Sequence, residues 1–207
     1  VIFEALMRGW PISRICELTG IDKFFISGMN RMVEAFQRAK ASGPDRDVLR
    51  DCKRLGLSDR DLALAWGMDE LQVVELRKKW GVTPVYKCVD TCAAEFEAAT
   101  PYYYSDYEME NEAGDASGKA LVVGAGPIRI GQGIEFDYCS VHAALALRRM
   151  GKGAIVVNNN PETVSTDFST SDKLYFEPLT AEDLSHVIDQ EHPDHVFFQF
   201  GGQTAIN

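Results

Sequence analysis

The spacing of apolar residues divides the chain into two regions with different periodicity. In the stretch "KFFISGMNRMVEAFQRAK", apolar side chains recur three and four residues apart, which predicts a helix with one apolar face that a partner helix covers. Those positions are Phe25, Met29, Met32, Val33 and Phe36. Residues 45–82 predict three further helices of roughly 8 to 12 residues. Their predicted starts and ends are Asp45 and Gly56, Ser58 and Gly67, and Asp69 and Gly81.

From about residue 119 the pattern changes to short apolar runs that alternate with amphipathic helices. The runs at 120–125, 153–161 and 195–202 are typical of buried parallel strands, and residues 136–150 and 180–192 are typical of helices. This strand, helix, strand, helix, strand order predicts a doubly wound parallel sheet with right-handed crossovers. In such a sheet the functional loops lie at the carboxyl ends of the strands.

The segment between these regions is aromatic and acidic and shows neither periodicity. Four tyrosines in residues 102–107 suggest an extended stretch that packs across another domain, and residues 110–118 resemble a polar linker. We therefore expect a helical domain with an extended aromatic tail at 1–113, a linker at 114–118 and an α/β domain at 119–207. Val1 lies within a helical pattern and Asn207 follows a turn sequence, so we expect both ends to be internal to a longer chain.

Composition narrows the class of function. The 207 residues are 45% apolar, enough for an ordinary core, and carry a formal charge of −10, which opposes non-specific binding to nucleic acid. The chain shows neither a run of about 20 apolar residues nor a charged leader, so we expect no membrane span and a cytoplasmic location. Five irregularly spaced cysteines indicate free thiols, and Cys88 and Cys92 have no second pair to complete a zinc site, so we expect no metal.

Residues 57–80 also resemble a helix-turn-helix unit, which gives an alternative function as a DNA-binding regulatory module fused to a nucleotide-sensing domain. The candidate recognition helix begins with Asp69 and Glu70, which would bring negative charge to the phosphates. Residues 1–113 hold fifteen Lys and Arg against nineteen Asp and Glu, a net charge of −4. Because DNA-binding domains are usually basic, we favour helix packing and expect no nucleic-acid partner.

The glycine-rich segment "GAGPIRIGQG" at 124–133 follows the first predicted strand. Gly124 and Gly126 match the first two positions of a dinucleotide-binding motif, but the third glycine comes late. The second strand ends in asparagines, including Asn158, where an acidic residue would hold a ribose. The segment also lacks the Gly-Lys-Ser/Thr of a P-loop, so we expect neither NAD, FAD nor a P-loop nucleotide.

Two interpretations of this loop remain open from its residues alone. Backbone amides and a helix dipole, with Arg129 and Gln132 beside them, could hold an anion. Alternatively the glycines permit a sharp turn against another part of the protein, while Arg129 pairs with Glu135 or Asp137. The histidines lie in or beside the predicted helices rather than at strand ends, so we expect no catalytic residue in this chain.

Long stretches of this sequence closely resemble one family. Residues 124–151, 156–178 and 197–207 are similar to the start of the carboxyl-terminal synthetase half of the carbamoyl phosphate synthetase large subunit. Residues 85–108 resemble the stretch just ahead of it, and the preceding helices resemble its oligomerisation domain. The resemblance implies a central fragment with a helical oligomerisation domain and an incomplete, Rossmann-like pre-ATP-grasp domain.

The resemblance further implies a parent enzyme, a carbon–nitrogen ligase, that makes carbamoyl phosphate from bicarbonate, glutamine-derived ammonia and two ATP for arginine and pyrimidine synthesis. Magnesium and potassium assist its phosphoryl transfers, which depend on charge placed around the phosphates. The implied partners are a glutaminase small subunit, which feeds ammonia through a tunnel, the remainder of the large subunit, and further copies through the helical domain. The ATP-grasp modules are absent from this sequence, so we expect the fragment alone to be inactive and to bind no cofactor.

If the resemblance holds, the residues of the glycine loop at 124–133 and Asn158 are candidates for contacts of that loop or for the wall of the ammonia tunnel, and not for catalysis. We expect the side-chain-poor sequence 131–133 to border the passage for ammonia or carbamate. The candidates are Gly124, Gly126, Arg129, Gly131, Gln132, Gly133 and Asn158.

Overall fold

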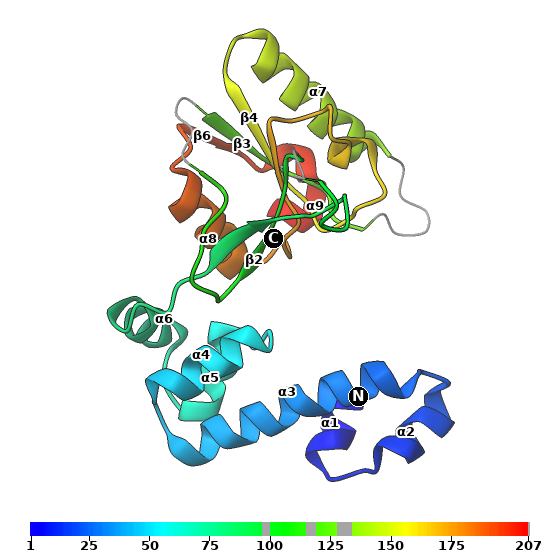
Figure 1. Ribbon diagram of the computed structural model, residues 1–207, viewed down its shortest axis with the longest axis vertical. Helices are drawn as coiled ribbons and strands as arrows, with labels where there is room; N and C mark the ends of the chain where they lie inside the picture. Colours follow the sequence, from blue (N-terminus) through cyan, green and yellow to red (C-terminus); the bar gives the residue numbers. More distant parts are fainter. Residues whose placement is uncertain (97–99, 115–118, 128–133, 207) are drawn as a thin grey trace. The chain divides into compact units, whose positions relative to one another are not determined.

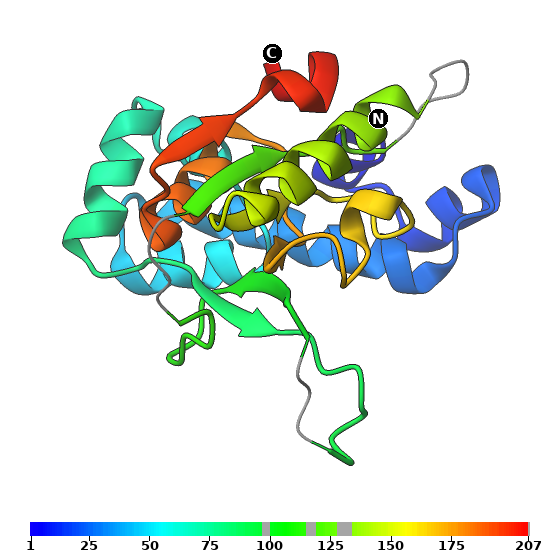
Figure 2. The same ribbon diagram turned by 90° about the horizontal axis from the view of Figure 1, so that it is seen from above.

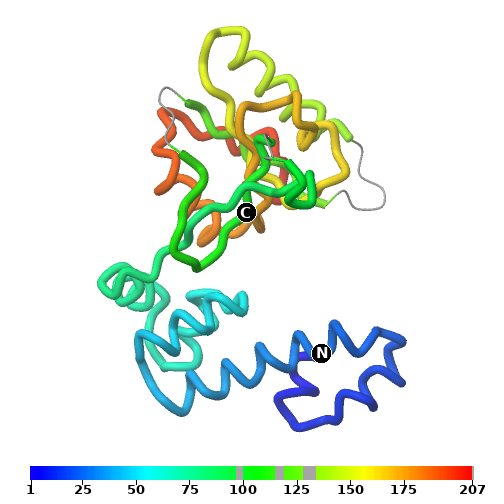
Figure 3. The backbone as a smooth tube through the Cα atoms, in the orientation of Figure 1, coloured from blue at the N-terminus to red at the C-terminus, as the bar shows by residue number. Residues whose placement is uncertain are grey.

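The computed structural model describes residues 1–96, 100–114, 119–127 and 134–206, which form two compact units, Val1–Thr83 and Pro84–Asn207. The chain passes from the first unit to the second once, after the last helix of the first (Figure 3). The domain boundary expected at 114–118 is corrected, because two strands that precede it belong to the sheet of the second unit. Residues 115–118 of the expected linker lie outside the described part of the chain.

The first unit is helical, as the periodicity predicts. Its central element is the long helix α3, with α1 and α2 along one side of its N-terminal half and α4 and α5 along the other side of its C-terminal half (Figure 1). Helix α6 packs on α5. The helices are α1 (Ile2–Met7), α2 (Ile12–Thr19), α3 (Lys23–Ser42), α4 (Arg46–Arg54), α5 (Asp59–Trp66) and α6 (Glu70–Lys79).

Short polar side chains fix where these helices begin. The Asp45 carboxylate accepts hydrogen bonds from two backbone amides in the first turn of α4. Ser58 and Asp61 form a reciprocal capping box at the start of α5, and Gly67 ends that helix in the left-handed conformation, with φ of 66°. The predicted starts of α4, α5 and α6 are confirmed. Each start is confirmed because the cap is a local interaction that the sequence displays directly.

The second unit contains a six-stranded sheet with the order β1-β2-β5-β4-β3-β6. Strands β1 and β2 pair antiparallel, and every other neighbouring pair is parallel. The predicted strands β3, β4 and β6 are confirmed, and the predicted extended aromatic segment contains β2. The strands are β1 (Val85–Cys88), β2 (Tyr102–Asp106), β3 (Lys119–Val123), β4 (Gly153–Val157), β5 (Lys173–Tyr175) and β6 (His195–Phe197).

Helices cover both faces of this sheet. Alternate residues of β3 point to opposite sides, so Ala120 and Val122 pack with α7 (Glu135–Arg149), whereas Leu121 and Val123 pack with α8 (Ala181–Glu191). The view from above shows the two helices on either side of the strands (Figure 2). Shorter elements complete the unit: η1 (Val164–Thr166), η2 (Gln199–Gly201) and α9 (Gly202–Ile206). The helical domain followed by a doubly wound α/β domain is thus confirmed.

Candidate functional site

The carboxyl end of β3 is the point where the strand order reverses. Strand β4 follows β3 on one side, and β6 returns on the other side, both parallel to it. In open α/β sheets this switch point is where ligands usually bind. Residues 124–126 of the glycine loop occupy this position, as the sequence predicts.

Asn158 organises the switch point. Its side chain is fully buried directly after β4. The side-chain carbonyl accepts hydrogen bonds from the Gly126 amide at 3.1 Å and the Asn160 amide at 3.3 Å, and its Nδ2 donates to Ser165 Oγ at 3.2 Å. One asparagine therefore joins the loop after β3, the loop after β4 and η1.

The described glycines of this edge are in contact with the chain's own atoms. A Cβ on Gly124 would lie 2.7 Å from Asn158 Cγ, and a Cβ on Gly201 would lie 2.7 Å from the Val123 carbonyl. Gly126 has φ of +72°, a conformation that favours glycine, and its missing side chain faces Asn159 Oδ1 at 3.3 Å. Close packing within the protein therefore accounts for the described glycines, Gly124, Gly126 and Gly201, and both interpretations of the loop as a whole stay predictions.

The other residues that the sequence suggests for the glycine-loop site lie outside the part of the chain that the structure describes. Arg129, Gly131, Gln132 and Gly133 lie outside the described residues, so their expected contribution to an anion site or a tunnel wall stays a prediction. The expected pairing of Arg129 with Asp137 or Glu135 stays a prediction for the same reason.

Asp137 has a structural role that the sequence interpretation missed. It lies in the first turn of α7 with only 7% of its surface exposed. One carboxylate oxygen, Oδ2, accepts hydrogen bonds from the amides of Val164 and Ser165 at 3.1 and 3.3 Å. Asp137 thereby holds the amino end of η1 against α7. The sequence around 161–166, with its alternating short polar residues, could have indicated a capped turn here, but not which acid reaches it.

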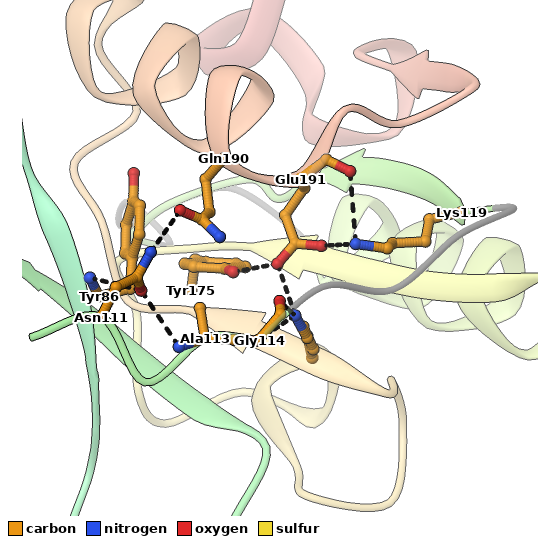
Figure 4. Close-up of polar contacts among 9 residues, drawn as sticks. Tyr86, Asn111, Ala113, Gly114, Lys119, Tyr175, Gln190 and Glu191 are labelled. Atoms are coloured by element: carbon orange, nitrogen blue, oxygen red, sulfur yellow. Dashed lines mark hydrogen bonds and ion pairs between the residues drawn. The ribbon is translucent and has the colours of Figure 1, made fainter.

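A buried charged cluster lies at the opposite, amino-terminal edge of the sheet. The Glu191 carboxylate at the end of α8 is fully buried and accepts hydrogen bonds from Lys119, the Tyr175 hydroxyl and, at 2.8 Å, Lys173 (Figure 4). Burial alone would raise the pKa of Glu191, but the hydrogen bonds from these three partners hold it below its ordinary value. We call Lys119, Lys173, Tyr175 and Glu191 the Glu191 cluster.

Residues 111–114 are attached to this edge rather than free as a linker. Asn111 Oδ1 accepts from the amides of Tyr86 and Ala113, each at 3.2 Å, and its Nδ2 donates to Gln190 Oε1 at 2.7 Å (Figure 4). Lys173 donates to the Gly114 carbonyl at 2.8 Å. The stretch therefore connects β1, β5 and α8 just ahead of β3.

A second buried carboxylate lies between β2 and the segment after β5. Glu177 is 3% exposed and accepts hydrogen bonds from the backbone amide and the hydroxyl of Ser105, the latter at 2.9 Å. Burial raises the pKa of Glu177 to about 7, although the bonds from Ser105 oppose the shift. The two hydrogen bonds from Ser105 hold β2 against the segment after β5, so we assign Glu177 a structural role.

Two of the four histidines have a structural setting. The His142 ring lies against the ring of Tyr138, with centroids 4.2 Å apart, and His192 ends α8 in the left-handed conformation. All five cysteines are free thiols. The helices of the described residues include none with the length and apolar character needed to cross a membrane.

Comparison with protein families assigns both units. Residues 1–81 match the oligomerisation domain of the carbamoyl-phosphate synthetase large chain, and residues 116–207 match the carbamoyl phosphate synthase preATP-grasp domain. The helix pair α5–α6, which could have been a helix-turn-helix unit, falls within the first match. The two matches occur in the order that the resemblance implies. The chain therefore belongs to the carbamoyl phosphate synthetase large-chain family and combines its oligomerisation domain with a pre-ATP-grasp domain.

Proposed function

We propose that this chain is the central, non-catalytic segment of the large subunit of a glutamine-dependent carbamoyl phosphate synthetase. The helical unit associates with further copies, and the α/β unit supports the half of the enzyme that phosphorylates carbamate. The observation that carries the proposal is the packed switch point. At Gly124 and Gly201 a side-chain atom would meet Asn158 and the backbone of β3, so both glycines support close packing of the chain against itself.

The parent enzyme in this proposal joins bicarbonate and glutamine-derived ammonia at the expense of two ATP, and its product serves arginine and pyrimidine synthesis in the cytoplasm. A glutaminase small subunit and the remainder of the large subunit are the proposed partners. At the described part of the carboxyl edge, the Asn158 side chain and Asp137 Oδ2 hydrogen-bond to the chain itself, which supports a structural role for both residues. We propose that ATP, magnesium and potassium are bound by the ATP-grasp modules of the parent.

Calorimetric titration of the purified chain with ATP and magnesium tests the scaffold role, with duplex DNA as a parallel titrant. We expect no saturable heat with either, and no ATP turnover. Saturable ATP binding that is lost in Arg129→Ala would instead make the glycine loop a nucleotide site. DNA binding that weakens steeply with salt would favour the regulatory alternative.

A second test addresses the passage that residues 131–133 are proposed to border. In the full-length enzyme, Gly133→Phe should allow glutamine hydrolysis to continue while carbamoyl phosphate formation falls, because a bulky side chain would obstruct transfer between sites. Both rates are measured in one reaction. Unchanged coupling of the two rates would remove Gly133 from the passage.

A further inference from the structure

The pairing of β2 with β5 ends in a side chain instead of a backbone carbonyl. The backbone hydrogen bond at the end of this pairing, at 2.8 Å, runs from the Phe176 amide to the Tyr103 carbonyl. In a parallel ladder the next donor on the same side of β2 is the amide two residues on, which belongs to Ser105. This amide donates to the Glu177 carboxyl group, so a side chain takes the place of a backbone carbonyl in the ladder.

Both oxygens of Glu177 are used to hold the end of β2. One accepts from the Ser105 amide and the other accepts from the Ser105 hydroxyl at 2.9 Å. Glu177 is 3% exposed, so these bonds are made away from water. Tyr86 of β1 is the position opposite Ser105 in the antiparallel pair, so the same bonds also hold β1 to the parallel strands. We call Ser105 and Glu177 the β2 latch.

The β2 latch lies on the first two strands of the α/β unit. Strand β1 begins at Val85, shortly after the helical unit ends at Thr83, and it pairs with β2 over four positions. The hydrogen bonds that join this pair of strands to the rest of the unit include the short β2–β5 ladder, the β2 latch and the contacts of residues 111–114. A change at the latch therefore alters how firmly the first strands are attached to the sheet.

The surroundings of Glu177 disfavour its ionised form. The described groups that act on it are Ser105 on β2, Tyr86 on β1 and Asp183 in the first turn of α8. Burial removes water from the carboxylate and Asp183 adds a like charge, and together they raise the pKa of Glu177 to about 7 against the bonds from Ser105. The buried Tyr86 hydroxyl has no hydrogen-bond partner among the described residues, so β1 adds no hydrogen bond to the carboxylate.

We propose that the β2 latch is a pH-sensitive switch, which stays closed while Glu177 carries its proton and releases the end of β2 when Glu177 ionises. The protonated group still accepts from the Ser105 amide through its carbonyl oxygen, and its own O–H can donate to the Ser105 hydroxyl. The ionised group is a buried charge that regains its hydration when the latch opens. The switch concerns the attachment of β1 and β2, and it goes beyond the proposed scaffold role.

Amide hydrogen exchange of the 207-residue chain tests the switch, with each rate corrected for the intrinsic effect of pH. In the open state Glu177 is hydrated and its pKa returns to 4.5, so the opening equilibrium at Ser105 should rise by about tenfold per pH unit between 4.5 and 7. The corrected exchange of the Ser105 amide should be roughly 70-fold faster at pH 8 than at pH 5. The Phe176 amide, which bonds to β2 just before the latch, is the internal reference and should change by less than about threefold.

Two variants separate the titration of Glu177 from other effects of pH. Glu177→Gln keeps an oxygen that accepts from the Ser105 amide but cannot ionise, so the corrected exchange at Ser105 should become independent of pH. Ser105→Ala removes a hydroxyl bond that favours the ionised form, so the titration midpoint of Glu177, read from its carboxyl carbon-13 shift, should rise by about one pH unit. Glu162→Gln changes an exposed carboxylate of the same unit and should leave the exchange profile of Ser105 unchanged.

The switch is overturned if the corrected exchange at Ser105 stays constant from pH 5 to pH 8, or if its pH dependence persists in Glu177→Gln. A midpoint that falls or does not move in Ser105→Ala would also overturn it, and this measurement does not depend on the folding of Glu177→Gln. Calorimetric titration with ATP decides the scaffold role independently of these results.

Discussion

Removing the charge of Glu191 should destabilise the α/β unit more than any other single charge change at the amino edge of the sheet. Lys119 is 3% exposed and Lys173 is 13% exposed, and both ammonium groups are balanced by this one carboxylate. In Glu191→Gln the side chain keeps its shape, but two poorly hydrated positive charges lose their counter-charge. Breaking a buried pair from one side costs about 3 to 5 kcal/mol.

The reasoning also predicts a compensating change. Lys119→Met removes the more deeply buried of the two ammonium groups, and Lys173 remains the partly hydrated one. In the double variant Lys119→Met/Glu191→Gln the buried uncompensated charge is therefore reduced. We expect the double variant to be more stable than Glu191→Gln alone, with a coupling free energy of about 2 kcal/mol.

Amide hydrogen exchange in β3 and β4 is the appropriate assay, because all three tryptophans, Trp10, Trp66 and Trp80, lie in the helical unit and do not report on the sheet. A loss of about 3 kcal/mol corresponds to exchange that is roughly 100-fold faster. Glu162→Gln, which changes an exposed carboxylate in the same unit, is the control. Two results would refute the role of Glu191 as a buried counter-charge. One is an amide exchange rate in Glu191→Gln within about threefold of the rate in the unmodified chain, and the other is a double variant in which the two effects on stability simply add.

Three further predictions concern the α/β unit. Burial raises the pKa of Glu177 from 4.5 to about 7, so this group stabilises the folded state below pH 4.5 and loses that contribution as the pH rises through 7. Urea titrations should show the free energy of unfolding falling by about 3 kcal/mol across this range of pH. Glu177→Gln should make the free energy of unfolding less dependent on pH over the same range. Asn158→Ala should cost about 2 to 3 kcal/mol in urea unfolding because it leaves buried amides unpaired, and Asn159→Ala, the neighbouring control, should cost less than 1 kcal/mol. Gly201→Ala should lower the thermal midpoint, because its methyl would meet the backbone of Gly124; an unchanged midpoint in calorimetry would contradict the close packing.

The helices and strands that sequence periodicity identifies are those that depend on residues close together in the sequence. The capping box at Ser58 and the left-handed Gly67 are set by residues within one helical turn, and the predicted helix start at Ser58 and helix end at Gly67 are both confirmed. Strands β3 and β4 are buried on both faces, so their continuous apolar runs are visible without knowledge of their neighbours.

The elements that periodicity missed depend on distant pairing. Strand β5 has three residues, and β2 consists of tyrosines followed by Ser105 and Asp106, so neither carries an apolar run. Each is a strand because Tyr102 pairs with Leu174 far along the chain. The same limit applies to the contact of Asn158 with Gly124, because it joins two loops that lie far apart in the sequence.

The strand order constrains how the protein can form during synthesis. All contacts within the helical unit are available once Thr83 has been made, so that unit can fold early. Strand β2, in contrast, needs β5 as its parallel neighbour, and β5 is separated from it in the chain by β3, α7 and β4. Until Lys173–Tyr175 has been synthesised, the tyrosine-rich strand has only β1 beside it and keeps one open edge. The nascent chain therefore carries the antiparallel pair β1–β2 with one edge unpaired. Slow translation through α7 would prolong the period in which a chaperone or another chain could bind this edge.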